Sequence, residues 1–257
     1  MVDFLKLVRR RSVWNELTYY TLNIGLASVL FILTQTIQSP FLAIVLVLLS
    51  KWRVLAVRPR FWWTNIQANM VDIIVGVSIV SLMYLPQLSV FMQAALAVIY
   101  ALWLVVLKPK SGHKYMTAQA FAAVILGTMA LYSSSHEWPV VIVVLAMYAI
   151  GYSAARHFLY GYEETQMVFL SAIWGLLLAE LGWLAYYWAY GYSLPGIPAL
   201  QVPQITIVAT LLAFVGERIY RSSVNNKQIV VGDVVLPAVF SGLLILVIML
   251  FFNSVVI

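Results

Sequence analysis

The chain has 257 residues, of which 63% are apolar and only 9% are charged, and it carries a formal net charge of +6. Soluble domains contain about 25% charged residues, so this composition excludes an ordinary soluble domain and indicates a membrane protein. The absence of cysteine from the sequence excludes disulfides, thiol catalysis and cysteine-ligated metals.

Nine apolar runs approach or reach the length of a spanning helix, which is about 20 mostly apolar residues. Runs such as 140–150 lack the alternation of a spanning β-strand. We therefore predict an all-α fold, a polytopic integral membrane helix bundle in which residues 1–257 form a single transmembrane domain without a soluble domain. The predicted spans are 18–37, 40–57, 66–84, 87–107, 116–133, 138–157, 167–190, 203–219 and 232–253.

The fifteen Lys and Arg residues fall in five clusters that share one side of the bilayer if every run crosses it. The predicted connections on the other side contain no Lys or Arg. Because positive charge is retained on the cytoplasmic face, we predict a cytoplasmic N-terminus, an outer C-terminus and a place in the cytoplasmic (inner or plasma) membrane. The net charge then indicates contact with lipid headgroups, not with nucleic acid. The clusters are Lys6, Arg9, Arg10 and Arg11; Lys51, Arg53, Arg58 and Arg60; Lys108, Lys110 and Lys114; Arg156; and Arg218, Arg221 and Lys227.

The second and third spans carry opposite charges at similar predicted depths. Lys51 follows Pro40 by eleven residues, about 16 Å of helix, which is too short to cross a hydrocarbon core of about 30 Å. We therefore expect the second helix to continue through Lys51 to about Val57. Asp72 lies about 14 Å deep in the antiparallel third span. We predict that Asp72 pairs with Lys51 or Arg53, and that this pair serves to fix the register of the two helices.

Five side chains on the predicted cytoplasmic connections are candidates for binding a phosphate or a lipid headgroup. A lipid-modifying enzyme would use them at the membrane surface. The three histidines do not have the spacing of zinc or haem ligands, and there is no glycine-rich phosphate loop. We therefore predict no metal and no cofactor, and we assign no catalytic residue. The candidates are Arg58, Arg60, Lys108, Lys110 and His113.

Glu180 is an ionisable residue within the seventh span. It lies thirteen residues after Met167, about 20 Å along a helix, and no Lys or Arg is predicted on that half of the protein. An intramembrane carboxyl is a functional candidate by default, so one interpretation is a group that exchanges a proton for a cation or solute. The other is a neutral acid that hydrogen-bonds between helices.

Small residues form a stripe along the same span. A stripe of this kind lets two helices approach closely. Because Glu180 is next to it, we expect Glu180 to face protein and not lipid. The residues of the stripe are Ser171, Gly175, Ala179 and Gly182.

Three functions are compatible with these features. The one we favour is a transporter or channel for a small solute, an ion or a lipid, with Glu180 as its titratable group. The second is a non-catalytic subunit or assembly scaffold, because short connections and few ionisable groups suit a protein that docks on other membrane subunits. The third is the lipid-modifying enzyme. Membrane lipids are the expected partners in all three.

Overall fold

A computed structural model of the chain describes residues 13–52, 56–86, 88–135, 137–188, 190–194 and 197–252. Within these ranges, one α-helix lies in each of the nine predicted spans, so the all-α fold is confirmed. The helices are α2 (Val13–Thr36), α3 (Phe41–Leu49), α4 (Trp62–Met83), α5 (Val90–Leu102), α6 (His113–Ser134), α7 (Val140–Tyr160), α8 (Met167–Tyr187), α9 (Gln204–Asn226) and α10 (Val231–Phe251).

Seven of the helices in the described residues are long and apolar enough to cross a membrane, namely all except α3 and α9. The chain is therefore a multi-pass membrane protein. Helix α3 has nine residues, about 14 Å of helix, and it ends at Leu49. The prediction that it continues through Lys51 to Val57 is wrong, because the backbone turns directly after Ser50. Helix α9 is long but carries charged side chains in its second half.

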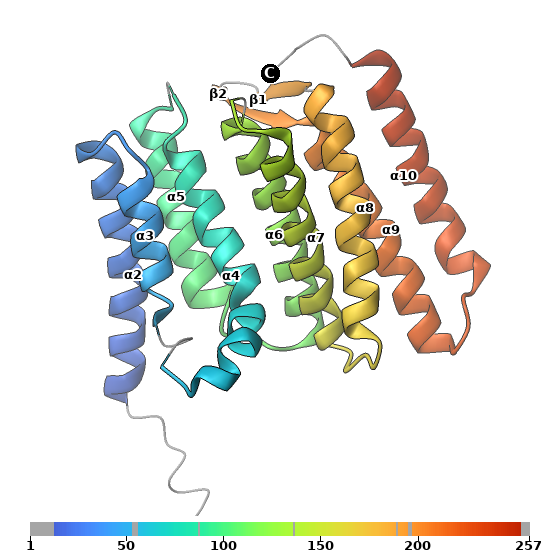
Figure 1. The fold of residues 1–257 in the computed structure, drawn as a ribbon, viewed down its shortest axis with the longest axis horizontal. Helices are drawn as coiled ribbons and strands as arrows, with labels where there is room; N and C mark the ends of the chain where they lie inside the picture. The colour runs from blue at the N-terminus through green and yellow to red at the C-terminus, as the bar shows by residue number, and fades with distance from the viewer. Residues whose placement is uncertain are drawn as a thin grey trace, which may run out of the picture.

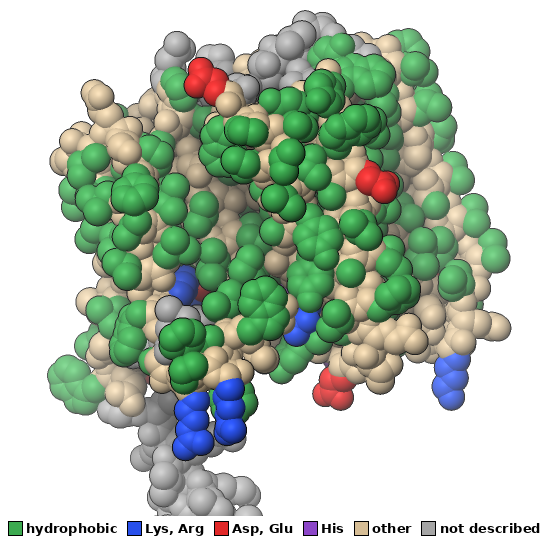
Figure 2. All heavy atoms as spheres, viewed as in Figure 1, with side chains coloured by type: hydrophobic (Ala, Val, Ile, Leu, Met, Phe, Trp, Pro, Cys, Tyr) green, Lys and Arg blue, Asp and Glu red, His purple; other side chains and the backbone are tan. Residues whose placement is uncertain are grey.

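The helices run alternately up and down, from α2 at one edge of the bundle to α10 at the other (Figure 1). Lys and Arg side chains gather toward the end where α2 and α10 begin (Figure 2). We call this the basic end and the opposite one the hairpin end. The first basic cluster, from Lys6 to Arg11, and Arg53 lie outside the described residues.

Helix α5 continues directly into η3, a π-helix at Trp103–Leu107. Its wider turn is closed by the Lys108 N–H, which donates to the Trp103 carbonyl five residues earlier at 2.9 Å. π-Helical turns inside longer helices are rare and often occur at functional sites. This one changes the direction of the side chains just before Lys108.

The connection between α8 and α9 contains a short antiparallel hairpin at the hairpin end (Figure 1). Strand β1 (Gly191–Leu194) pairs with β2 (Ile197–Pro203), and Tyr192 lies opposite Val202. We predicted no strand in this connection. The Gln204 N–H then donates to the Tyr190 carbonyl at 2.8 Å, at the point where α9 begins.

The small-residue stripe of α8 is buried against α7, as its pattern predicted. A Cβ atom at Gly182 would lie 2.6 Å from Met147 Cγ, and one at Gly151 of α7 would lie 2.9 Å from Leu178. Such distances show that both helices depend on glycine to approach this closely. The result is a tightly packed pair beside the cavity described next.

Candidate functional site

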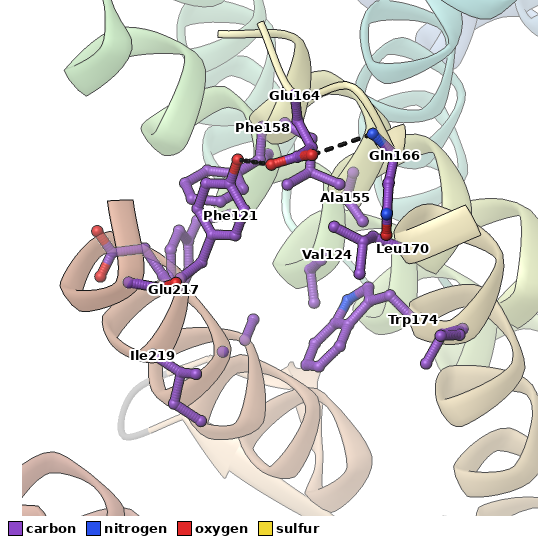
Figure 3. Close-up of a pocket in the computed structure, with 18 of the residues that line it drawn as sticks. Phe121, Val124, Ala155, Phe158, Glu164, Gln166, Leu170, Trp174, Glu217 and Ile219 are labelled. Carbon is purple, nitrogen blue, oxygen red and sulfur yellow. Dashed lines mark hydrogen bonds between the residues drawn. The ribbon is translucent and has the colours of Figure 1, made fainter. Parts of the chain in front are cut away.

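A cavity of about 520 Å³ lies among α6, α7, α8 and α9, in the half of the bundle nearer the basic end (Figure 3). Its lining comes from the first halves of α6 and α8 and the second halves of α7 and α9. It also includes Glu164, Gln166 and Ile229, which lie in connections at the basic end. The cavity therefore extends from that end into the bundle. Its volume is in the range of sites for small ligands.

Small side chains on three helices create this space. Ala120 of α6, Ala154 and Ala155 of α7, and Ala213 and Gly216 of α9 all line the cavity. A Cβ atom at Gly216 would only make an ordinary contact, 3.4 Å from the Trp174 ring. Packing at α9 is therefore looser here than between α7 and α8.

Larger apolar side chains complete the walls. The Trp174 ring projects toward the cavity from α8, and Phe121, Val124 and Leu170 surround it (Figure 3). The deeper part of the cavity thus presents carbon atoms almost entirely. An apolar cavity of this shape suits a hydrocarbon chain, because binding removes the apolar surface of both the chain and the cavity from water.

Polar groups lie at the rim, near the basic end. The Tyr220 hydroxyl donates to Glu164 Oε2 at 2.7 Å, and the Gln166 backbone N–H donates to Glu164 Oε1 at 3.0 Å (Figure 3). These bonds, the Gln166 one first, lower the pKa of the Glu164 carboxyl, because they stabilise its charged form. The carboxylate is therefore held at the edge of an apolar cavity.

Aromatic rings fix the position of Tyr220. The ring of Phe158 meets it edge-on with 5.4 Å between centroids, and Tyr162 does so at 5.3 Å. The ring of His113 lies 4.9 Å from that of Tyr162. His113 was predicted as a phosphate or headgroup candidate, and the structure places it in this aromatic group behind the rim.

Glu217 is the second acid on the cavity lining, and its charge is compensated locally. Its carboxylate pairs with the Arg221 guanidinium, and Arg218 Nε lies 3.6 Å from Oε2. The carboxylate lies on the side of α9 turned away from Trp174 (Figure 3). The aliphatic part of the Glu217 side chain thus contributes to the cavity wall, whereas its carboxylate is paired with arginines of the same helix.

A separate polar cluster lies among α3, α4 and η3. Asp72 of α4 is 7% exposed, and its Oδ2 atom is 2.5 Å from Lys51 Nζ and 2.6 Å from Lys108 Nζ. The Trp103 indole N–H donates to Oδ1 at 3.0 Å. The structure therefore brings Lys51 and Asp72 together and adds Lys108, a third member that we did not predict. All three helical segments are tied to one carboxylate.

The remaining headgroup candidates make local contacts. Arg58 precedes the short 3-10 helix η2 (Pro59–Phe61) and Arg60 lies within it; both are exposed, and the Arg60 guanidinium lies 4.6 Å from the centre of the Phe61 ring. Lys110 Nζ lies 4.4 Å from the centre of the Tyr115 ring. Nothing in these contacts joins the candidates into one phosphate site.

Glu180 is exposed on the outer face of α8. The expectation that it faces protein is therefore wrong for this chain by itself. The reason is helical geometry: Ala179 is buried against α7, and the next residue is rotated by about 100°. Glu180 does not line the cavity.

Within the described ranges, no three His, Asp or Glu side chains gather closely enough to hold a metal ion. The sequence alone did not identify Glu164, Gln166 and Tyr220 as site residues. The sequence signals only a polar connection at the end of α7, and it does not indicate that Tyr220, 56 residues later, meets Glu164.

Comparisons with protein-family models, with curated proteins and with solved structures gave no match to this chain.

Proposed function

We propose that this membrane protein is a carrier for an amphipathic, lipid-like molecule whose apolar chain occupies the cavity among α6, α7, α8 and α9. The observation that carries the proposal is the combination of carbon-lined walls with a polar rim at one end. A hydrocarbon chain would be buried beside Trp174, and a hydrogen-bonding head would remain near Glu164 and Gln166.

The charge distribution supports an orientation for this site. With the basic end toward the cytoplasm, the cavity lies in the cytoplasmic half of the bilayer. The rim is then at the level of the headgroups, and the walls are at the level of the acyl chains. An amphipathic molecule could enter from that leaflet without removing its polar head from water.

Direct contacts join α6 to α8 and to α9 beyond the cavity, toward the hairpin end. The Thr128 hydroxyl of α6 donates to Thr206 Oγ1 of α9 at 3.0 Å. The Tyr132 hydroxyl donates to the Gly182 carbonyl of α8 at 2.6 Å. A carrier opens alternately to two sides around its site. In this proposal these contacts separate when the cavity opens toward the hairpin end.

Glu180 has no part in this mechanism, because it lies outside the cavity. Lipid transport was one of the functions that the sequence favoured, and the proposal retains it. The apolar cavity, and not the titratable carboxyl of Glu180, is now the proposed site.

A cavity-filling substitution tests the proposal. In Gly216→Leu, the Cβ fits against Trp174 and the rest of the side chain occupies the cavity. The matched control is Gly242→Leu on α10, where a Cβ meets nothing within 4 Å. Native mass spectrometry of gently extracted protein should find a lipid-like molecule retained by the wild type and by the control, but not by Gly216→Leu.

A binding measurement sharpens this result. A fluorescent long-chain fatty acid and a fluorescent lysophospholipid serve as probes. At least one should bind Gly216→Leu roughly tenfold more weakly than Gly242→Leu, a difference of about 1.4 kcal/mol. Equal binding by the two variants would contradict the proposal.

A further inference from the structure

The outward face of α8 combines a carboxyl with large apolar side chains. Ile173, Leu176, Trp183 and Tyr187 are all exposed along this face, at the three- and four-residue spacings of one helix surface. Glu180 is exposed in the middle of them. We call these five residues the Glu180 face.

The carboxyl is at a depth where lipid is a poor environment for it. Glu180 precedes Tyr187, the last residue of α8, by seven residues, about 10 Å of helix. In the described part of the chain, no hydrogen bond or ion pair reaches its side chain. Ionisable residues in membrane spans almost always face protein or a water-filled space. Acyl chains offer no hydrogen-bond donor or acceptor, so lipid alone leaves this group unsatisfied.

Other exposed helices do not have this problem. The exposed side chains of α10, such as Leu236, Phe240, Leu243 and Leu250, are apolar over the same range of depths. Lipid covers such a surface without cost. Over this range of depths the two helices differ by one carboxyl, and it is this group that needs a protein partner.

We propose that the Glu180 face is the contact surface for a second copy of this chain, in which the two α8 helices meet and the two Glu180 carboxyls hydrogen-bond to each other. A neutral carboxyl has one O–H donor and acceptor oxygens, so it is complementary to an identical group. A two-fold axis brings the same patch of both subunits together. Two copies therefore satisfy both carboxyls without any other group.

The charges of the chain favour an acid–acid contact over an ion pair between copies. In the described residues, all Lys and Arg lie toward the basic end, whereas Glu180 lies toward the hairpin end. The described part of a second copy thus offers no cation at the level of Glu180. The packing of α8 agrees with this arrangement: its small residues face α7, so its large apolar side chains remain free for an intersubunit contact.

Cysteine cross-linking in native membranes tests the dimer, because the chain has no cysteine of its own. Leu176→Cys and Leu184→Cys place a thiol one turn before and one turn after Glu180, and both positions are exposed. Leu243→Cys on α10 is the matched control. Mild oxidation should give a disulfide-linked homodimer from at least one α8 variant and not from the control.

Three results would overturn the proposal: no dimer from either α8 variant, equal dimer formation by Leu243→Cys, or cross-linking of the α8 thiols to a different polypeptide. Substitution of Glu180 then separates the carboxyl from the apolar contact. Glu180→Gln retains a donor and an acceptor and should preserve the dimer. Glu180→Leu should lower the association constant roughly three- to twentyfold, the range for one interhelical hydrogen bond in a membrane.

The position of Glu180 makes these variants informative. Its side chain is exposed in the single chain, so the substitutions leave the packing of α8 on α7 unchanged. Equal association by the wild type and Glu180→Leu in detergent would contradict the carboxyl pair. Of the Glu180 face only Ile173 also lines the cavity, and Glu180 itself lies outside it, so the Glu180 variants should bind the probes as the wild type does.

Discussion

The polar cluster around Asp72 and the cavity among α6 to α9 use side chains in opposite ways. At Asp72, two lysines and an indole converge on one carboxylate and leave it almost completely covered. At the cavity, alanine and glycine leave space between the helices, and the carboxylate of Glu164 stays at the rim. One region is closed by charge and the other is kept open by small residues.

This difference is the basis for proposing the cavity, and not the Asp72 cluster, as the ligand site. The Asp72 carboxylate already has three partners, and those partners join α3, α4 and η3. Its chemistry is that of a structural ion cluster. The side chains of the cavity walls leave a space between them, and the hydrocarbon chain of the proposed ligand would fill it and contact them.

Removing the Asp72 carboxylate should destabilise the polar cluster, and we expect this substitution to have the largest effect on stability. Asp72→Leu leaves Lys51 and Lys108 facing each other without a counter-charge, and Lys51 is buried. Loss of one partner from a buried ion pair costs about 3–5 kcal/mol. We expect a loss of this size in the free energy of unfolding, measured by denaturant titration in detergent micelles. Gly216→Ala should change this value by no more than about 1 kcal/mol.

A double-mutant cycle tests whether the ions act together. In Asp72→Leu with Lys51→Met, the second substitution removes one of the two uncompensated charges, so the double variant should be more stable than the sum of the single effects predicts. Lys108 is partly exposed and can turn toward water. Strictly additive losses for Asp72 and Lys51 would show that the pair contributes no coupling.

A pair of glycine substitutions should show the difference in packing. Gly182→Ala places a Cβ 2.6 Å from Met147 Cγ, whereas Gly216→Ala makes an ordinary contact at 3.4 Å. Overpacking of a tight contact costs about 1–3 kcal/mol. An exposed or loosely packed helical glycine changed to alanine gains up to about 1 kcal/mol. We therefore expect opposite changes in the melting temperature. A similar decrease for both variants would show that α9 packs as tightly as the α7–α8 pair.

The sequence predicted the parts of this structure that depend on local composition. Apolar runs located the nine α-helices of the described residues, and the small-residue stripe on α8 identified a surface for close helix packing. The matching depths of Lys51 and Asp72 placed them near each other. The same reasoning placed the end of the second helix wrongly, because it assumed that every helix crosses the full core. Helix α3 instead ends at Leu49, and Lys51 reaches Asp72 from a turn.

The cavity could not be predicted in the same way. Its space is created by alanines and a glycine on α6, α7 and α9, and such residues are common at any contact between membrane helices. Which of them pack and which leave space depends on how the helices approach one another. For Glu180, the sequence did give the position within the span. It did not give the direction of the side chain, which depends on how α8 packs on α7.

A substitution at the polar rim of the cavity should have the smallest effect on stability, and the size of this effect should depend on pH. Tyr220→Phe removes the hydrogen bond to Glu164 and leaves the one from Gln166. Because the carboxyl is only partly buried, we expect a loss at neutral pH of under about 1 kcal/mol in the free energy of unfolding. Tyr162→Phe is the control, since its ring also packs on Tyr220 but does not bond to Glu164.

The sign of the pH dependence follows from the lowered pKa of Glu164 in the folded protein. A lowered pKa means that the charged carboxyl stabilises the fold above the pKa of the unfolded chain, about 4.3, and that this contribution is lost as the pH falls through the folded value. Tyr220→Phe raises the folded pKa toward the unfolded one. Its melting temperature should therefore differ from that of the wild type at pH 7 and approach it below about pH 4. A difference that persists unchanged in acid would mean that Tyr220 stabilises the rim through its ring contacts and not through Glu164.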